Sequence, residues 1–383
     1  MASRTSTQAG SGLDRYFKIS ERGSTVRTEV VAGLATWLTM AYILFVNPGI
    51  LTSLPDHTGL TLPFNQVVTV TALVAGVMTI LMGVYANYPF AMAAGLGLNA
   101  FVAFTLVGAN GLSWPEAMGV IVIEGLAITV LVLTGFRTAV LNAIPMDLKR
   151  AIGIGIGLFI AFIGLRNAGI VVVGEGTPLR LAPDLTSWPI VVFAFGLAVT
   201  ATLVARKMRG ALLIGILATT ILAIIVNAAT DAPYWAPGVA ELPDKVAETP
   251  NFGLVGDFSF NVFKVLGLAS ALAAILSVML SDFFDTMGTV IGIGGEAKLL
   301  DSEGKLPGIN RVLLVDSLGA AAGGAASASS NTTYIESAAG VAEGGRTGLA
   351  SVVTGALFLV ALFLAPIAGV VPNEATAPVL VLV

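Results

Sequence analysis

The stretch NYPFAMAAGLGLNAF, Asn87 to Phe101, decides how this chain folds, because it is apolar and yet poorly suited to a lipid-facing helix. Gly95 and Gly97 within it permit a break in the backbone. A second stretch of similar character, GAASASSNTTYIESAAG, runs from Gly324 to Gly340. Irregular backbone is tolerated at membrane depth only where it is buried in protein or lines a wet cavity. The two stretches therefore predict broken segments that meet inside a membrane protein.

The composition of the whole chain places it in the membrane class. Of 383 residues, 56% are hydrophobic and 11% are charged, whereas soluble proteins average roughly 25% charged residues. The chain has no cysteine and a single histidine, His57. Disulfides, thiolate metal sites and a zinc cluster are thereby excluded, and no cofactor is predicted.

Eight segments are apolar over the length of about 20 residues that a membrane-spanning helix needs. They are 26–46, 66–84, 114–133, 151–173, 189–205, 211–228, 262–280 and 347–370. Three further apolar segments, 86–107, 309–326 and 327–341, are rich in Gly, Ala, Ser or Asn. Counting each of these as one crossing predicts eleven crossings and the start of a twelfth after Pro372.

The basic residues agree with this map if the N-terminus is cytoplasmic. All but four of the 19 Lys and Arg then fall on the inside, the exceptions being Arg166, Arg180, Lys245 and Lys264. This is the distribution that the positive-inside rule requires. Residues 1–25 lack the apolar core of a signal peptide and are predicted to form a cytoplasmic arm. We expect a multi-pass protein of the cell membrane.

The two small-residue stretches are the third and tenth predicted crossings, seven crossings apart. An odd spacing requires that the two halves have opposite topology, which is the inverted repeat of many secondary transporters. Substrate binds in such folds near the bilayer midplane, where the broken segments meet. Asn99 and Glu336 are then expected to face one another across the site. The alternative is that the small residues only allow ordinary helices to pack closely.

Four more acids lie in apolar surroundings. Asp282 and Asp285, in SDFFDTMGTV, are spaced i, i+3 and share a face if their helix continues. Acids in membrane segments tend to be functional, so we expect substrate contact or proton coupling there. The alternative is that the pair marks the solvated end of a span. For Glu124 and Asp316, which lie outside the broken segments, we favour a structural or gating role.

The chemistry of the candidate site favours a neutral ligand. No basic residue lies near it in the sequence, so an anion would lack a counter-charge. A small flat heterocycle with N–H and C=O edges fits carboxylates and an amide better. A buried carboxyl group can also carry a proton. The candidates for coupling binding to proton symport in this way are Asp282, Asp285 and Glu336.

Five ordered motifs carry a family resemblance over essentially the whole chain. They are LDRYFKISERGSTVRTEVVAGLATWLTMAYILFVNPGIL, AMAAGLGLNAF, AIGIGIGLFIAFIGLRNAGIV, SDFFDTMGTVIGIGG and NTTYIESAAGVAEGGRTGLASVVTG. With them, the chain resembles the AzgA-type purine permeases of the nucleobase/ascorbate transporter superfamily. The resemblance implies proton-coupled uptake of hypoxanthine, guanine or adenine by an elevator-like movement. Asn99, Asp282, Asp285 and Glu336 would bind the base, assisted by backbone amides around Ile335.

The resemblance also implies an all-α fold of fourteen spans in two inverted repeats of seven, divided into a core domain and a gate domain. We assign 26–134 and 262–370 to the core domain, 135–230 and 371–383 to the gate domain, and 231–261 to an extracellular loop. The last gate spans of the family would then be absent after Val383.

Several alternatives stay open. An adenine-preferring permease belongs to the same family, and sulfate-type anion carriers share the general fold, although sulfate would prefer a basic group. An intramembrane aspartyl protease needs two acids, yet Asn99 stands where the second might be. A passive channel would not need carboxylates in broken segments. The expected partners are a purine base, protons and lipid. A homodimer is considered as the assembly, and no nucleic acid is expected.

Overall fold

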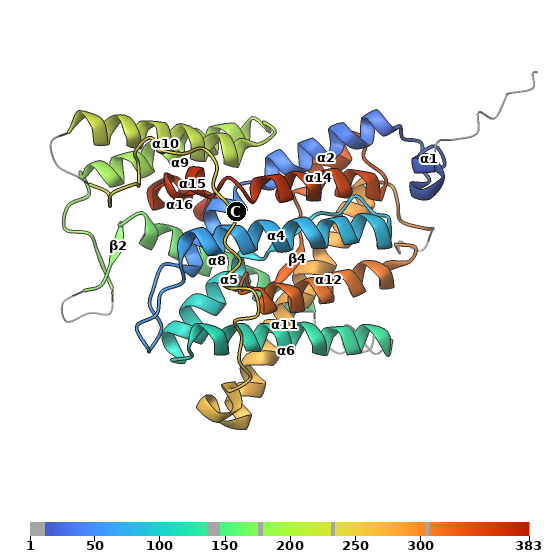
Figure 1. Cartoon of the computed structure of the whole chain (residues 1–383), viewed down its shortest axis with the longest axis horizontal. Coiled ribbons are helices and arrows are strands. Elements are labelled where there is room, and N and C mark those ends of the chain that lie inside the picture. The colour runs from blue at the N-terminus through green and yellow to red at the C-terminus, as the bar shows by residue number, and fades with distance from the viewer. Residues whose placement is uncertain (1–11, 136–145, 175–178, 231–233, 303–305, 383) are drawn as a thin grey trace, which may run out of the picture.

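The computed structural model describes residues 12–135, 146–174, 179–230, 234–302 and 306–382. Most helices run along one common direction (Figure 1). The first part of the chain forms α1 (Gly12–Phe17), α2 (Val26–Met40), α3 (Ile43–Leu51), α4 (Phe64–Leu81) with its π-helical continuation η1 (Met82–Ala86), β1 (Met92–Ala94), α5 (Leu96–Ala100), π-helical η2 (Phe101–Ala109) and α6 (Trp114–Leu133).

The middle of the chain forms α8 (Met146–Asn167), the short hairpin of β2 (Val171–Val172) and β3 (Arg180–Leu181), α9 (Trp188–Ala205) and α10 (Ala211–Ala229). The last part forms α11 (Val262–Glu296), α12 (Ile309–Ala325), β4 (Asn331–Thr333), α13 (Ser337–Ala342), α14 (Gly348–Ala361), α15 (Ala365–Gly369) and α16 (Asn373–Leu382).

Six of the described helical segments are long and apolar enough to cross a membrane. They are Val26–Leu51, Phe64–Ala86, Trp114–Leu133, Trp188–Ala205, Ala211–Ala229 and Val262–Glu296. Three shorter helices, Leu96–Ala109, Gly157–Asn167 and Gly348–Ala361, are also apolar. The chain is a helical, multi-pass membrane protein, while the count of eleven crossings stays a prediction.

The predicted spans differ from the structure in detail. The span 26–46 lies in one apolar segment, Val26–Leu51, in which Ala41 and Tyr42 separate α2 from α3, and the span 347–370 is divided into α14 and α15. The largest difference is α11, predicted to end at residue 280, which continues to Glu296 after a kink at Gly267 (φ 73°, ψ 164°). Asp282 is only 1% exposed and Asp285 is exposed, but the helix continues past both to Glu296, so the interpretation of the acid pair as the end of a helix is wrong.

The two small-residue stretches meet and pair with one another inside the molecule. Each contains a short strand followed by a short helix, β1 with α5 and β4 with α13. The strands pair antiparallel, with Met92 opposite Thr333 and Ala94 opposite Asn331. The Thr79 hydroxyl of α4 accepts a hydrogen bond from the Met92 amide at 2.9 Å and donates one to its carbonyl at 3.1 Å. Backbone groups that helical hydrogen bonds would otherwise satisfy are thus paired away from water.

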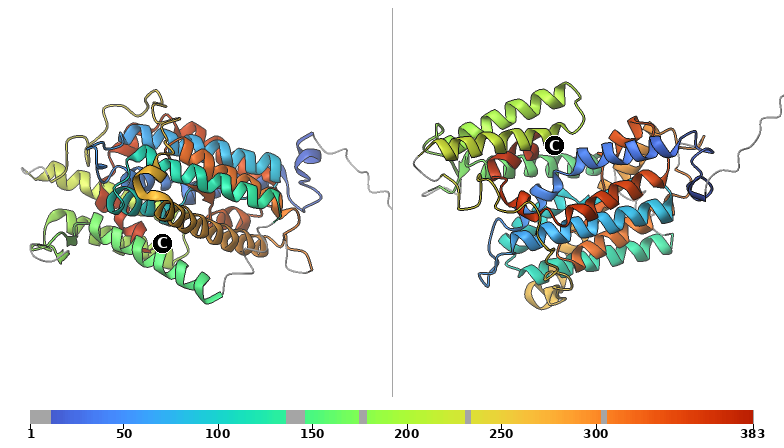
Figure 2. Two further views of the ribbon diagram at one scale, coloured as in Figure 1. Left: turned by 90° about the horizontal axis from the view of Figure 1, so that it is seen from below. Right: turned by 45° about the horizontal axis from the view of Figure 1, so that its top comes forward.

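The helices form two groups (Figure 2). In one group, α14 packs against α2 and α4 while α12 packs against α6. Glycines let α14 and α4 approach closely, because a Cβ atom at Gly355 would lie 2.6 Å from the Gly76 carbonyl oxygen. In the other group, α9 packs against α10, and α16 packs against α8 and α9. The division into core and gate domains remains our interpretation of these groups.

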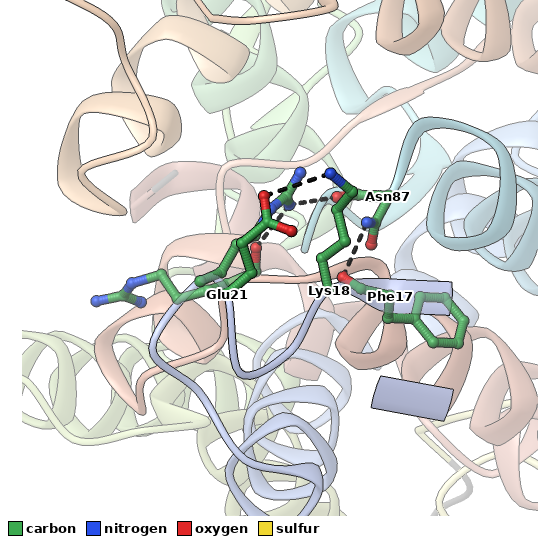
Figure 3. A network of polar contacts seen from close by, with 6 residues as sticks. Phe17, Lys18, Glu21 and Asn87 are labelled. Carbon is green, nitrogen blue, oxygen red and sulfur yellow. Dashed lines mark hydrogen bonds and ion pairs between the residues drawn. The ribbon is translucent and has the colours of Figure 1, made fainter. Parts of the chain in front are cut away.

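From Gly12 onward, the predicted N-terminal arm is packed against the helices. Phe17 and Ile19 are 5% and 1% exposed and form a small hydrophobic cluster with Leu349 of α14. Asn87 joins the same junction, donating from its side-chain amide to the Phe17 carbonyl at 2.9 Å (Figure 3). The Asn87 side-chain oxygen also accepts a hydrogen bond from the Gly348 amide at 2.8 Å. The arm is therefore tied to η1 and to the start of α14.

Candidate substrate site

A cavity of about 480 Å³ lies where the broken segments meet α11. The β1–α5 connection contributes Gly95 to Leu98, and the segment from Thr333 to Glu336 covers another side. Residues of α11 and of α8 complete the wall: Ser281, Phe284, Asp285, Gly288, Thr289, Gly157 and Ile160. Tyr42, just before α3, also lines the cavity. The strand pair fixes the two segments relative to one another, so the cavity has a defined shape.

Glu336 stands in this wall at the residue immediately before α13. The Tyr42 hydroxyl donates a hydrogen bond to its Oε1 atom at 2.5 Å, and the Thr39 hydroxyl donates to its backbone carbonyl at 3.3 Å. Short hydrogen bonds to a carboxylate are among the stronger ones in proteins. The α2–α3 junction therefore fixes the orientation of Glu336 at the cavity wall.

The two aspartates of α11 lie in different surroundings although they are only one turn apart. Asp285 lines the cavity and is near enough to Glu336 for the two charges to interact. Asp282 is not among the lining residues; its carboxyl group lies within hydrogen-bonding reach of Glu124 on α6. Residues three apart in a helix differ by about 60° in direction, which is enough to separate these two environments.

The pair of Glu124 and Asp282 is closed off from solvent. The two residues are 0% and 1% exposed. Within the described part of the chain, none of their carboxylate oxygens receives a hydrogen bond from a donor group. Two adjacent carboxyl groups without a donor cannot both be ionised at low cost. The pair can hold a proton between its oxygens, away from the substrate cavity.

Asp316 of α12 supports the strand β4. Its Oδ1 atom accepts hydrogen bonds from the Thr333 amide at 2.9 Å and the Thr333 hydroxyl at 2.8 Å. Its Oδ2 atom accepts one from the Thr286 hydroxyl of α11 at 2.6 Å, and Thr286 is in turn 2.8 Å from the Thr332 hydroxyl. These contacts join α11, α12 and β4 behind the cavity, as expected of a residue with a structural role.

Asn99 and Ile335, the remaining predicted site residues, are placed differently from one another. Ile335 lines the cavity and is 53% exposed. Asn99, on α5, is fully buried and is not among the lining residues, although its neighbours Leu96, Gly97 and Leu98 are. Both polar atoms of its side-chain amide lack a hydrogen-bond partner among the described residues. The expected juxtaposition of Asn99 with Glu336 is therefore not seen as a direct contact.

Sequence reasoning missed the aromatic residues of the site. Tyr42, Phe284 and Tyr334 line the cavity, and the Tyr334 hydroxyl donates to the Ala94 carbonyl at 2.6 Å. The signal for Tyr42 was weak: one hydroxyl inside MAYILFV, a run that reads as an ordinary span. Among the described lining residues there is no Lys, Arg or His. The cavity thus offers carboxylate acceptors and aromatic rings, which suit a flat ligand with N–H groups better than an anion.

Comparison with known proteins agrees with these features. The Permease family matches residues 27–383 of the chain. The adenine permease AdeQ of Escherichia coli (strain K12) is 39% identical over 371 residues, which cover 97% of this chain and 79% of AdeQ. The guanine/hypoxanthine permease PbuG of Bacillus subtilis (strain 168) is 39% identical over 374 residues, covering 97% of this chain and 82% of PbuG.

The fold is also similar to that of a solved membrane transporter structure. The transmembrane domain of the cyanobacterium bicarbonate transporter BicA superposes with a TM-score of 0.66 at 14% sequence identity, covering 93% of this chain and 87% of that domain. At this identity, the likeness concerns the fold alone. The family match and the relatives at 39% identity confirm the resemblance drawn from the motifs, and the chain belongs to the Permease family.

Proposed function

We propose that this chain imports purine nucleobases, with hypoxanthine and guanine as the first candidates, by proton symport. The observation that carries the proposal is the pair of acids Asp285 and Glu336 in one cavity, in a chain similar to purine permeases along nearly its whole length. The cavity volume of about 480 Å³ lies within the range of roughly 300–1,000 Å³ typical of small-molecule sites.

The cavity chemistry supports a base rather than an anion. Carboxylates accept hydrogen bonds and cannot donate them when ionised, so Asp285 and Glu336 pair with the N–H edge of a heterocycle. The rings of Tyr42, Phe284 and Tyr334 supply faces for stacking on a planar ligand. One of the two acids takes up the coupled proton, because two neighbouring carboxyl groups resist simultaneous ionisation.

An elevator-type movement is the mechanism that we propose for transport. Nearly all of the wall comes from α11, which packs against α6 of the first group, and from the broken segments in contact with it. Gly157 and Ile160 come instead from α8 of the other group. A ligand bound to the first group would therefore travel with it, and α8 would cover the site from the other group. This division favours rigid movement of one group past the other over local opening of a channel.

The experiment is uptake of labelled hypoxanthine by cells that lack their own purine permeases and express this chain. We expect uptake that collapses with a protonophore and is inhibited by unlabelled purines but not by uracil or sulfate. Relatives named for adenine and for guanine/hypoxanthine are equally similar at 39% identity. Competition by adenine therefore decides between the substrates. Inhibition by sulfate alone would contradict the proposal and favour an anion carrier.

A substitution at Glu336 tests its place in this function. Glu336→Gln keeps the shape of the side chain but removes the charge and the proton carrier. We expect this variant to reach the membrane and to lose accumulation of hypoxanthine. Glu241→Gln, in an exposed acid of the segment between α10 and α11, is the control and should transport normally. Normal accumulation by Glu336→Gln would remove Glu336 from the coupling mechanism.

A further inference from the structure

A second cavity adjoins Glu336. Its volume is about 170 Å³, and its walls come from three elements: Thr39 of α2, Ala339 of α13, and the turn into α10 with Met208, Gly210, Ala211 and Leu212. Within the described chain, Glu336 is the one residue that lines both this cavity and the candidate substrate cavity. Glu336 therefore stands between two separate spaces.

The second cavity reaches the protein surface on a basic side. Met208 in its wall is 45% exposed, and the same turn carries Arg206, Lys207 and Arg209. This is the side that the positive-inside rule predicts to be cytoplasmic. The turn lies beside the C-terminal end of α2, since a Cβ atom at Gly210 would be 3.4 Å from the Leu38 carbonyl oxygen. The cavity thus joins Glu336 to that surface without passing through the substrate cavity.

The size and lining of this cavity suit water rather than a nucleobase. A buried water needs about 10–15 Å³ of such space and two or more polar partners. The cavity of about 170 Å³ has that room, and Glu336 and Thr39 are the polar side chains in its lining. The remaining wall is formed by small or apolar residues, which offer no second binding partner for a purine edge.

We propose that the second cavity is a water-filled passage through which Glu336 releases its proton to the side of Arg206–Arg209, while the base leaves from the first cavity. The inference rests on the proposed function. In the step, the O–H bond of the Glu336 carboxyl group breaks and the proton moves to a water molecule as hydronium. The electron pair stays on the carboxylate, which keeps the hydrogen bond donated by Tyr42.

Charged groups lie on both sides of Glu336 and act on this step. On the substrate side, Asp285 is near enough to interact with Glu336 and, when it is charged, opposes loss of the proton from Glu336. Near the outer end of the second cavity, Arg209 forms an ion pair with Glu343, the residue that directly follows α13. The ion pair offsets the charge of Arg209, and the exposed side chains of Arg206 and Lys207 are screened by salt over about 10 Å. The basic turn therefore raises only a weak barrier to hydronium. The passage is thus open to proton release when the base has left.

The test fills the passage from two walls. Ala339→Leu on α13 and Leu212→Phe on α10 add bulk to the second cavity. Matched controls on the same helices are Ala342→Leu and Ile214→Phe, at exposed positions that line neither cavity. Each protein is reconstituted in liposomes. Two rates of hypoxanthine transport are measured: net uptake driven by a proton gradient, and exchange of internal for external hypoxanthine at equal pH.

The proposal predicts that filling the second cavity slows net uptake but not exchange. Exchange does not require Glu336 to lose its proton, whereas net uptake does. We expect net uptake to fall about tenfold in the filled variants, as for a barrier raised by about 1.4 kcal/mol, while exchange and both control variants stay normal. Unchanged net uptake in both filled variants would overturn the proposal, and so would equal loss of uptake and exchange. Wild-type uptake that ignores a protonophore would instead contradict the proposed function, and this inference with it.

Discussion

The hydrogen bond from the Tyr42 hydroxyl to Glu336 can be tested by a single substitution. Tyr42→Phe removes the hydroxyl that donates to Glu336 and leaves the ring in the cavity wall. A hydrogen bond to a charged group contributes about 1.5–3 kcal/mol, so the apparent affinity for hypoxanthine should weaken about 10- to 150-fold if Glu336 needs this bond to bind the base. Tyr85→Phe is the control, because Tyr85 is 46% exposed and does not line the cavity.

The outcome that would contradict this assignment is a specific one. If Tyr42→Phe and Tyr85→Phe transport with the same apparent affinity, the hydroxyl of Tyr42 contributes nothing to ligand binding. Glu336 would then be oriented sufficiently by its position before α13.

The two aspartates of α11 should respond differently to the same change. Asp285→Asn alters the substrate cavity and should raise the apparent KM for hypoxanthine. Asp282→Asn should leave KM unchanged, because Asp282 faces Glu124 instead and an amide can donate to that carboxyl group. Asp282→Ala should be less stable by about 1–3 kcal/mol, since Glu124 stays buried without a partner.

Uptake kinetics and thermal unfolding in detergent check this pair of expectations. A rise in KM for Asp282→Asn as large as that for Asp285→Asn would place both residues in the substrate site and refute the separation described above.

At the scale of elements, the loop before α4 is joined to α6 by Asp56. Its Oδ1 atom accepts hydrogen bonds from Thr58 and Leu60, and its Oδ2 atom accepts one from the Trp114 amide at 3.1 Å. Burial alone would raise the pKa of Asp56, but the hydrogen bond from the Thr58 hydroxyl and those from backbone amides outweigh it and hold the pKa below its ordinary value of 3.8.

This lowered pKa predicts a pH dependence of stability. A carboxyl group with a depressed pKa in the folded state stabilises the fold fully above its unfolded pKa, and the contribution is lost as pH falls through the folded pKa. We expect Asp56→Asn to unfold at a lower temperature than the wild type at pH 7. The difference should shrink once the pH drops below 3.8. A difference that is constant from pH 7 to 3 would contradict this origin.

The two broken segments depend on one another for their backbone hydrogen bonds. The glycines and small residues of the sequence indicated where the helices break, but pairing of β1 with β4 satisfies their backbone. The break between α2 and α3 was missed because 26–46 is uniformly apolar, and the end of α11 was placed at residue 280 because the criterion was a continuous apolar run of about 20 residues. The burial of Asp282 inside the continued helix has no such signal in the sequence.

At the scale of the whole molecule, the ion pair of Arg209 with Glu343 links the group of α9 and α10 to the group of α13. Exposed ion pairs contribute about 0.2–1 kcal/mol, so breaking this one should shift the balance between arrangements by up to about fivefold. The arrangement seen in the structure should then be less populated.

Cysteine accessibility measures this shift cleanly, because the chain has no cysteine of its own. Ala339→Cys places a thiol in the second cavity, which reaches the surface in this arrangement. Its reaction with a charged thiol reagent should slow in Arg209→Gln and in Glu343→Gln. The exchanged pair, Arg209→Glu with Glu343→Arg, should restore the rate. Equal rates in the single variants and the wild type would show that the ion pair does not hold the two groups.

By itself, the sequence determined the membrane class, the positions of most helices, the two broken segments and the family. Each of these follows from local composition, charge distribution or motifs, which are readable along the chain. Only the tertiary structure decided which polar groups meet. Tyr42 reaches Glu336 across 294 positions of sequence, and Asp285 and Asp282 point into different surroundings. Such contacts are set by how packed helices present their faces to one another, and a pattern along one segment does not contain that information.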